Sequence, residues 1–316
     1  MARHAQFAAV LLAALAVHGT LLAAPKNTDR HQFGVIGHSF HDGGGEAKLK
    51  RAIADQGEAA LAFVVVTGIK GANESCSDKL YEKRREMFDD ARRPMIVVPA
   101  ASDWSECKNS TGRSIAIERL NRLRELFFSE ATSLGTHKLA VTRLSASPRF
   151  RSYGENSHWQ IGDVLYATVN LPANNNHYRP EAGRNSEFED RLVANRFWLN
   201  RLFAMARREK RDAIVLFSEA DVKALTQPTG FRALLNRANS KLDGFDEPRR
   251  QIASLSAKFP GKVLLIDTDG ARKGSEPSIE WRGNLGHLSL GSGAVEVKVT
   301  PGAGSLFTLK NAADEK

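Results

Sequence analysis

The sequence has few features that would place it outside the ordinary globular class. After its N-terminal residues it lacks any run of about 20 apolar residues that could cross a membrane. It also lacks low-complexity tracts, internal repeats and the phosphate-binding patterns GxxxxGK[ST] and GxGxxG. Hydrophobic residues make up 42% of the 316 residues and charged residues 26%, which is typical of a globular protein. We therefore expect one domain over residues 25–316.

The first 24 residues have the pattern of a secretory signal peptide. Arg3 supplies a short positive region, 7–17 is a short apolar segment, and 21–24 offers small residues for cleavage. We expect cleavage at the end of 21–24 and a mature protein that is periplasmic or secreted. The alternative is an uncleaved N-terminal anchor. No transmembrane segment is expected after cleavage.

Cysteine is scarce, with Cys76 and Cys107 as its only occurrences. Neither belongs to a CxxC pair or lies near histidines at zinc-binding spacing, so the cysteines do not indicate a zinc site. Two cysteines in an oxidising compartment usually form a disulfide, although two free buried thiols are the alternative. A Cys76–Cys107 disulfide would close a loop of about 30 residues and stabilise the fold by roughly 3–4 kcal/mol.

Basic residues outnumber acidic ones by 45 to 36, which gives a formal net charge of +9. The basic residues fall in short runs that alternate with Glu and Asp, as on the solvated face of a helix. The alternative is a surface that attracts an anionic ligand of the cell envelope, such as a lipid or a glycan. Specific nucleic-acid recognition is not indicated.

Short apolar runs alternate with amphipathic stretches along the chain. This order predicts an α/β fold, a layered β-sandwich flanked by helices. The end of the chain, 285–309, alternates apolar and polar residues and predicts antiparallel strands. The other expected strands are 33–37, 61–66, 95–98, 138–143, 163–170, 213–217 and 262–266, and the expected helices are 46–60, 77–92, 115–133, 189–208 and 247–257.

Polar side chains follow several of the expected strands. Ligands of such sheets bind at the carboxyl ends of strands, so these side chains define a candidate pocket. They could serve only as turn and solvated loop residues. Alternatively, they form a remodelled pocket for one metal ion or a polyol, if their geometry converges. The residues are His38, His41, Asp42, Asp103, Asn170, Glu219, Asp267 and Asp269.

Six segments of the chain resemble one known family. They are FGVIGHSF at 33–40, VTGIKG at 66–71, CSDKLYEKRREMF at 76–88, VVPAASDWSEC at 97–107, GDVLYATVNLPANNN at 162–176 and FPGKVLLIDTDG at 259–270. These segments resemble the calcineurin-like metallophosphoesterases, in particular an exported bacterial branch. The resemblance implies the fold of that family and retention of both cysteines. Such enzymes hold two metal ions with Asp, Asn and His side chains at strand ends.

At the positions where this resemblance places metal ligands, the sequence has other residues. The family has an Asp after the first strand, where this sequence has His38. Its second strand ends in a Gly-Asp pair, and the Asp of that pair is replaced by Gly68. The ligand position after the third strand is Ala101, and the adjacent catalytic position is Ser102. The family's final motif, HGDTH, corresponds to residues 267–271, and its last His is replaced by Ala271. Glycine and alanine offer no side-chain donor, so we expect the usual two-metal centre to be absent.

The sequence therefore favours an exported protein of this fold that is catalytically inactive and has a ligand-binding or scaffolding role in the envelope. No cofactor is expected. The alternative is a metal-dependent phosphoester hydrolase with one divalent metal ion held by His38, Asp103, Asp267 and Asp269. A weaker alternative is a serine hydrolase that uses Ser39, because GHSFH approximates the GxSxG elbow; its fifth residue, however, is His.

Overall fold

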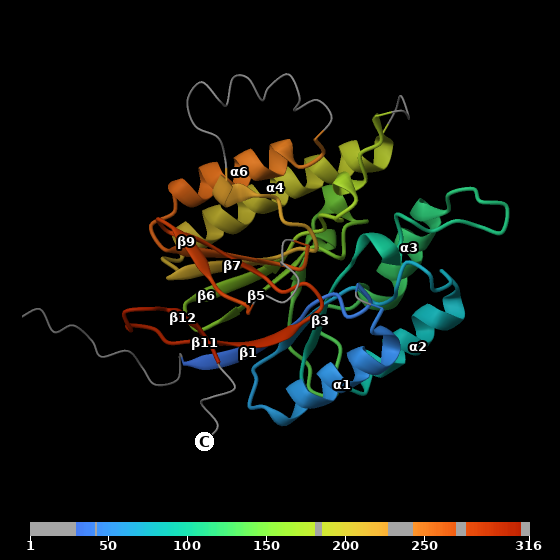
Figure 1. Ribbon diagram of the computed structural model, residues 1–316. Helices are drawn as coiled ribbons and strands as arrows, with labels where there is room; N and C mark the ends of the chain where they lie inside the picture. Colours follow the sequence, from blue (N-terminus) through green and yellow to red (C-terminus); the bar gives the residue numbers. More distant parts are fainter. Residues whose placement is uncertain (1–29, 42, 181–184, 227–242, 270–275, 311–316) are drawn as a thin grey trace, which may run out of the picture.

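The computed structural model describes residues 30–41, 43–180, 185–226, 243–269 and 276–310. The expected signal peptide, Asp42 and Ala271 lie outside these residues. The chain forms two mixed β-sheets packed face to face, with helices on the outer faces (Figure 1). Within the described part of the chain, no helix is long and apolar enough to cross a membrane.

One sheet has five strands in the order β12-β11-β1-β2-β3. The strands β1, β2 and β3 run parallel, so their carboxyl ends meet at one edge. The strand β11 pairs antiparallel with both β1 and β12. The bounds are β1 His31–Ile36, β2 Val64–Thr67, β3 Met95–Val98, β11 Ala294–Val299 and β12 Phe307–Leu309.

The second sheet has seven strands in the order β4-β5-β6-β7-β8-β10-β9. Its central strands β6, β7, β8 and β10 are parallel, and both edges are antiparallel. The bounds are β4 Thr142–Arg143, β5 Ser157–Ile161, β6 Val164–Thr168, β7 Ala213–Phe217, β8 Lys262–Asp267, β9 Glu280–Arg282 and β10 Leu285–Ser289.

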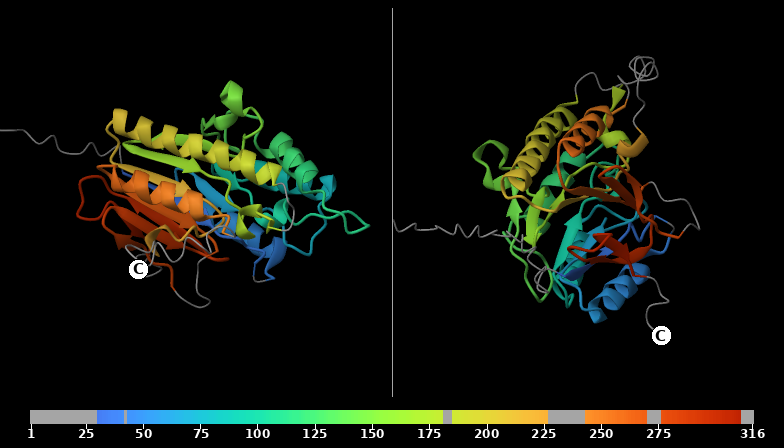
Figure 2. Two further views of the ribbon diagram at one scale, coloured as in Figure 1. Left: turned by 90° about the horizontal axis from the view of Figure 1, so that it is seen from above. Right: turned by 90° about the vertical axis from the view of Figure 1, so that its left-hand side faces the viewer.

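Three hydrophobic cores hold these layers together. One lies between the two sheets and contains Phe33, Phe63, Tyr166 and Phe217. A second lies between the seven-stranded sheet and two helices, α4 (Ser186–Arg208) and α6 (Asp246–Ala257). The third lies between the five-stranded sheet and three helices (Figure 2). These are α1 (Gly45–Glu58), α2 (Asp78–Asp89) and α3 (Ala116–Phe127).

The predicted layered α/β sandwich is confirmed, as is the start of α2. The hydroxyl of Ser77 caps this helix by accepting a hydrogen bond from the amide of Leu80 at 3.3 Å. Two helix and strand boundaries were wrong. The helix expected over 115–133 ends at Phe127, and the strand expected over 138–143 is reduced to β4. Thr132, inside the expected helix, instead pairs with Ala140, inside the expected strand, so chain pairing overrides local helix propensity there.

The expectation of antiparallel strands over 285–309 was wrong for β10. This strand pairs in parallel with β8, although it is antiparallel to β9. Alternation of apolar and polar residues reports which face of a strand is buried, but it does not report the direction of the neighbouring strand. The strand β5 was not predicted at all.

The structure joins Cys76 to Cys107 through a disulfide, with 5.9 Å between their Cα atoms. The bond ties the segment before α2 to the loop after β3. The predicted pairing is therefore confirmed.

Replacing both cysteines with serine is expected to lower the free energy of unfolding by about 3 kcal/mol, because the unfolded chain gains the freedom of an open loop. Urea unfolding of the double variant measures this loss, and reduced wild-type protein should show a loss of similar size. Peptide mapping under non-reducing conditions that found both thiols free would contradict the pairing.

Candidate functional site at the strand ends

Three positions that the resemblance assigns to the metal centre lie together at the carboxyl ends of β1, β2 and β3. The imidazole Nε2 of His38 lies 3.1 Å from the hydroxyl of Ser102. A Cβ atom added at Gly68 would lie 2.2 Å from His38 Cδ2 and 2.6 Å from its Nε2. The His38 ring therefore fills the space above Gly68. This centre offers one imidazole and one hydroxyl at these positions.

The electrostatics around His38 do not favour a cation. Burial, with smaller contributions from His41 and Lys70, lowers the pKa of His38 to about 4, so the ring is neutral at pH 7. Lys70 is itself buried, and its ammonium donates to the carbonyls of Gly71 at 2.7 Å and Ser102 at 2.8 Å. A metal ion beside His38 would have to lie close to this ammonium group.

Acid is expected to destabilise the protein through His38. Its folded pKa of about 4 lies below the ordinary value of 6.5, so the unfolded chain binds more protons, and stability is lost as the pH falls through this window. Between pH 7.5 and pH 4.5 the loss from this group is about 2 kcal/mol. Urea unfolding at several pH values should show that His38→Gln loses less stability than wild type by this amount. The exposed His137 provides the matched control, and an effect of His137→Gln as large as that of His38→Gln would contradict the assignment.

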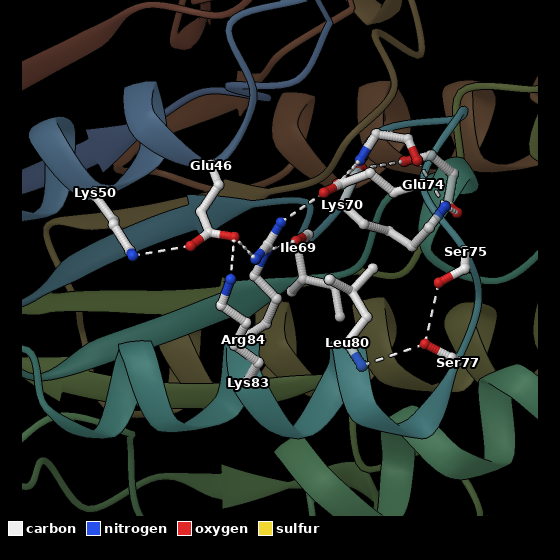
Figure 3. A network of polar contacts seen from close by, with 12 residues as sticks. Glu46, Lys50, Ile69, Lys70, Glu74, Ser75, Ser77, Leu80, Lys83 and Arg84 are labelled. Atoms are coloured by element: carbon white, nitrogen blue, oxygen red, sulfur yellow. Dashed lines mark hydrogen bonds and ion pairs between the residues drawn. The ribbon is translucent and has the colours of Figure 1, made fainter.

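A buried arginine fixes the loop that follows β2. The side chain of Arg84 donates to Ile69 O at 2.8 Å and to the carboxylates of Glu46 at 2.6 Å and Glu74 at 2.8 Å (Figure 3). Glu74 in turn accepts from the amide of Gly71. These contacts connect α1 and α2 to Ile69 and Gly71, the two residues that flank Lys70. The position of Lys70 is therefore fixed by both helices.

Asp103 lies inside this loop system. One carboxylate oxygen accepts from the amides of Ile69 at 3.0 Å and Lys70 at 3.2 Å, and the other accepts from the amide of Ala100 at 2.8 Å. Burial raises the pKa of Asp103 to about 6, while these backbone hydrogen bonds and Lys70 act in the opposite direction. Asp103 therefore acts as a turn residue whose carboxylate accepts hydrogen bonds from backbone amides, which is the first of the two roles that the sequence allowed.

Glu219 links the two sheets at the same edge. Its Oε2 accepts from the amides of Ala101 and Ala173, both at 2.7 Å. Ala101 follows β3 in one sheet, whereas Ala173 follows β6 in the other. Burial raises the pKa of Glu219 to about 8, and the charges of Asp103 and Asp269 contribute to the increase.

Asn170 belongs to a buried polar network beneath α4. Its side-chain amide donates to Glu155 Oε1 at 3.1 Å, and its backbone carbonyl accepts from Asn195 at 3.0 Å. Glu155 is completely buried and pairs with Arg124, which donates from two nitrogens at 2.6 and 2.9 Å. The network positions the strand end of β6 against α4 and α3.

His41 and Asp269 lie nearer the surface than these residues. The ring of His41 is 6.2 Å from that of His38. Burial raises the pKa of Asp269, as do the neighbouring carboxylates of Asp267 and Asp221, whereas His41 acts to lower it. The predicted rim residues thus share one edge of the sandwich, but their strongest contacts divide them into separate groups.

Asp267 belongs to a cluster that the sequence analysis did not identify. His287 Nε2 hydrogen-bonds to Asp267 Oδ2 and lies 3.7 Å from Asp221 Oδ1. One possible metal-ligand atom from each residue lies within 4.8 Å of the others. Burial alone would lower the pKa of His287, but the hydrogen bond and charge of Asp267, together with Asp221, raise it above its ordinary value.

The sequence held little signal for this cluster. Asp221 follows Glu219 by two residues and could have been included with the end of β7. His287 lies within β10, and only the pairing of β10 with β8 brings it beside Asp267.

A separate cavity of about 610 Å³ lies where α3 and α4 begin. It contains the basic side chains Arg113 and Arg179 and the acidic side chains Glu118 and Glu187. Its charge therefore does not select for an anion. The other lining residues are Asn109, Ser114, Ile115, Ala116, Ile117, His177, Asn185, Ser186 and Phe188.

No protein-family model and no curated protein matches the chain. The likeness to calcineurin-like metallophosphoesterases therefore rests on the sequence motifs.

Proposed function

We propose that this chain is an exported protein of the calcineurin-like metallophosphoesterase type whose two-metal centre has been replaced. It acts in the cell envelope by binding or scaffolding and does not hydrolyse phosphoesters. The observation that carries the proposal is the buried imidazole of His38, which fills the space above Gly68 and contacts Ser102.

The chemistry of phosphoester hydrolysis explains why this observation matters. Two metal ions clamp the phosphoryl oxygens and generate a hydroxide, and holding two divalent ions requires several oxygen and imidazole ligands together. His38, Gly68 and Ala101 provide no carboxylate at the positions where the family has its ligands. Asp103, which lies two residues after Ala101, has a carboxylate, but it accepts three backbone hydrogen bonds. The residues present do not fit a two-metal centre, so we derive no hydrolytic step.

The proposal is tested by assaying the purified protein with p-nitrophenyl phosphate and bis-p-nitrophenyl phosphate in the presence of Mn²⁺ or Zn²⁺. We expect no turnover above that of the buffer with the same metal. Metal-dependent turnover that His38→Ala abolishes would contradict the proposal. The control is His137→Ala, because activity lost equally in both variants would not come from the strand-end centre.

The second candidate is a metal-dependent phosphoester hydrolase with one remodelled metal site. It is favoured by the cluster of Asp221, Asp267 and His287. This cluster includes Asp267 of the residues proposed from the sequence, whereas His38 and Asp103 make separate buried contacts. A hydrolase of this kind would show turnover that His287→Gln abolishes and His38→Ala leaves intact.

A further inference from the structure

We propose that Asp221, Asp267 and His287 bind one divalent cation of the zinc class. This site is distinct from the centre around His38 and does not depend on the proposed function. Three chain segments bring the ligands together, namely the loop after β7, the end of β8 and the strand β10. One imidazole and two carboxylates are a ligand set that suits Zn²⁺, with a position left for water.

The separations within the cluster fit a metal ion. Bonds of about 2.0–2.2 Å in a tetrahedral site place neighbouring ligand atoms about 3.4 Å apart. His287 Nε2 and Asp221 Oδ1 are 3.7 Å apart, and the possible ligand atoms all lie within 4.8 Å of one another. His287 Nε2 and Asp267 Oδ2 are closer than this, because they hydrogen-bond directly. A cation would replace that hydrogen bond, and Nε2 of His287 would release its proton to solvent as it binds the metal.

The carboxylate of Asp267 is oriented by neighbouring groups. Ser289 donates from its hydroxyl to Asp267 Oδ1 at 2.6 Å, and the amide of Asp269 donates to the same oxygen at 3.2 Å. Asp221 Oδ1 accepts from the amide of Lys223 at 2.7 Å. Partners of this kind fix the orientation of ligands and strengthen metal binding. Because β8 and β10 are paired in register, Asp267 and His287 stand on a rigid support, and Asp221 approaches them from the loop after β7.

The side chains of Asp267 and His287 lie on the helix-covered face of the seven-stranded sheet, and not on the face that packs against the other sheet. Leu265 lies two residues before Asp267 and pairs with His287, and it packs in the core beneath α4 and α6. Ile266 precedes Asp267, Leu288 follows His287, and these two residues pair with each other and pack between the two sheets. Side chains alternate along a strand, so Asp267 and His287 face the helix side. The replaced positions His38 and Gly68 follow strands of the other sheet.

The cluster is accessible from solvent. The side chains of His287 and Asp221 are 18% and 20% exposed, whereas that of Asp267 is 3% exposed. A cation can therefore reach the cluster from its His287 and Asp221 side, where solvent water is available to complete the coordination.

A purely structural ion pair between His287 and Asp267 is the competing explanation. The test uses the full chain after treatment with EDTA, and measures Zn²⁺ and Mn²⁺ binding by titration calorimetry and by thermal shift. We expect one Zn²⁺ per chain and an increase in melting temperature, because a metal that binds the native state stabilises it by mass action. His287→Gln and Asp221→Asn should each weaken Zn²⁺ binding by about 100-fold.

The control is His137→Gln, which makes the same substitution at an exposed histidine and should leave Zn²⁺ binding unchanged. Should His287→Gln prove unfolded, Asp221→Asn carries the test, because Asp221 lies in a loop. Absence of a wild-type shift, or binding equal in wild type and both site variants, would leave only a structural ion pair and overturn the proposal. Zn²⁺ binding without turnover supports both proposals, whereas turnover that depends on His287 would contradict only the proposed function.

Discussion

Replacing Gly68 with alanine is expected to lower the free energy of unfolding by about 4 kcal/mol. The new Cβ would lie 2.2 Å from His38 Cδ2 and 3.2 Å from Ala100 Cβ, so a buried ring would have to move. Gly68 also has a φ of +75°, a conformation that disfavours residues with a Cβ. Urea unfolding measures the loss. A second variant separates the clash with His38 from the cost of the positive φ.

The double variant His38→Ala/Gly68→Ala removes the ring that the new methyl group would meet. We expect the Gly68→Ala substitution to cost only about 1–2 kcal/mol in the His38→Ala background, which is the cost of the left-handed backbone. Gly112 is the matched control, because its φ is +79° and nothing lies within 4 Å of an added Cβ. If Gly68→Ala costs no more than Gly112→Ala, His38 does not occupy the space above Gly68.

Replacing Arg124 with methionine is expected to lower the free energy of unfolding by about 4 kcal/mol. Arg124 donates two hydrogen bonds to Glu155, whose side chain is completely buried. Its removal leaves Glu155 with the neutral amide of Asn170 and without the cation that hydrogen-bonds to it, and a poorly compensated buried charge is costly. Chemical unfolding near pH 7 measures this difference.

The same helix provides the control for this prediction. Arg122 lies two residues away and pairs with Glu82 and Glu125, whose side chains are 53% and 66% exposed. Exposed ion pairs contribute about 0–1 kcal/mol, so Arg122→Met should have a small effect. Equal losses in Arg122→Met and Arg124→Met would show that general loss of helix charge, and not the burial of Glu155, sets the cost.

The layers of the fold could be predicted from local signals. Runs such as Val64–Thr67 and Met95–Val98 consist largely of β-branched residues and form fully buried parallel strands. Ser77 signalled the start of α2 because its hydroxyl satisfies a free amide of the first turn. The direction of β10 depends on its partner β8, which lies about 20 residues earlier in the chain, and alternation carried no information about it.

The strand-end positions were also predictable in part. The resemblance indicated that His38, Gly68 and Ser102 belong to one centre, and the structure brings these three residues together. The separate roles of the carboxylates were not predictable, because sequence spacing does not reveal hydrogen-bond partners. Asp103 turned inward to backbone amides, whereas Asp267 joined His287 through a strand pairing that no motif records.

The most direct test of whether the ends of β1, β2 and β3 have lost their metal centre is anomalous diffraction from crystals of the protein soaked in Mn²⁺ or Zn²⁺. We predict no anomalous peak within bonding distance of His38 or Ser102, even where a peak forms beside His287. Two peaks between the strand ends of β1 and β3, with His38 as a ligand, would show that a two-metal centre persists and would contradict the proposed loss of hydrolytic function.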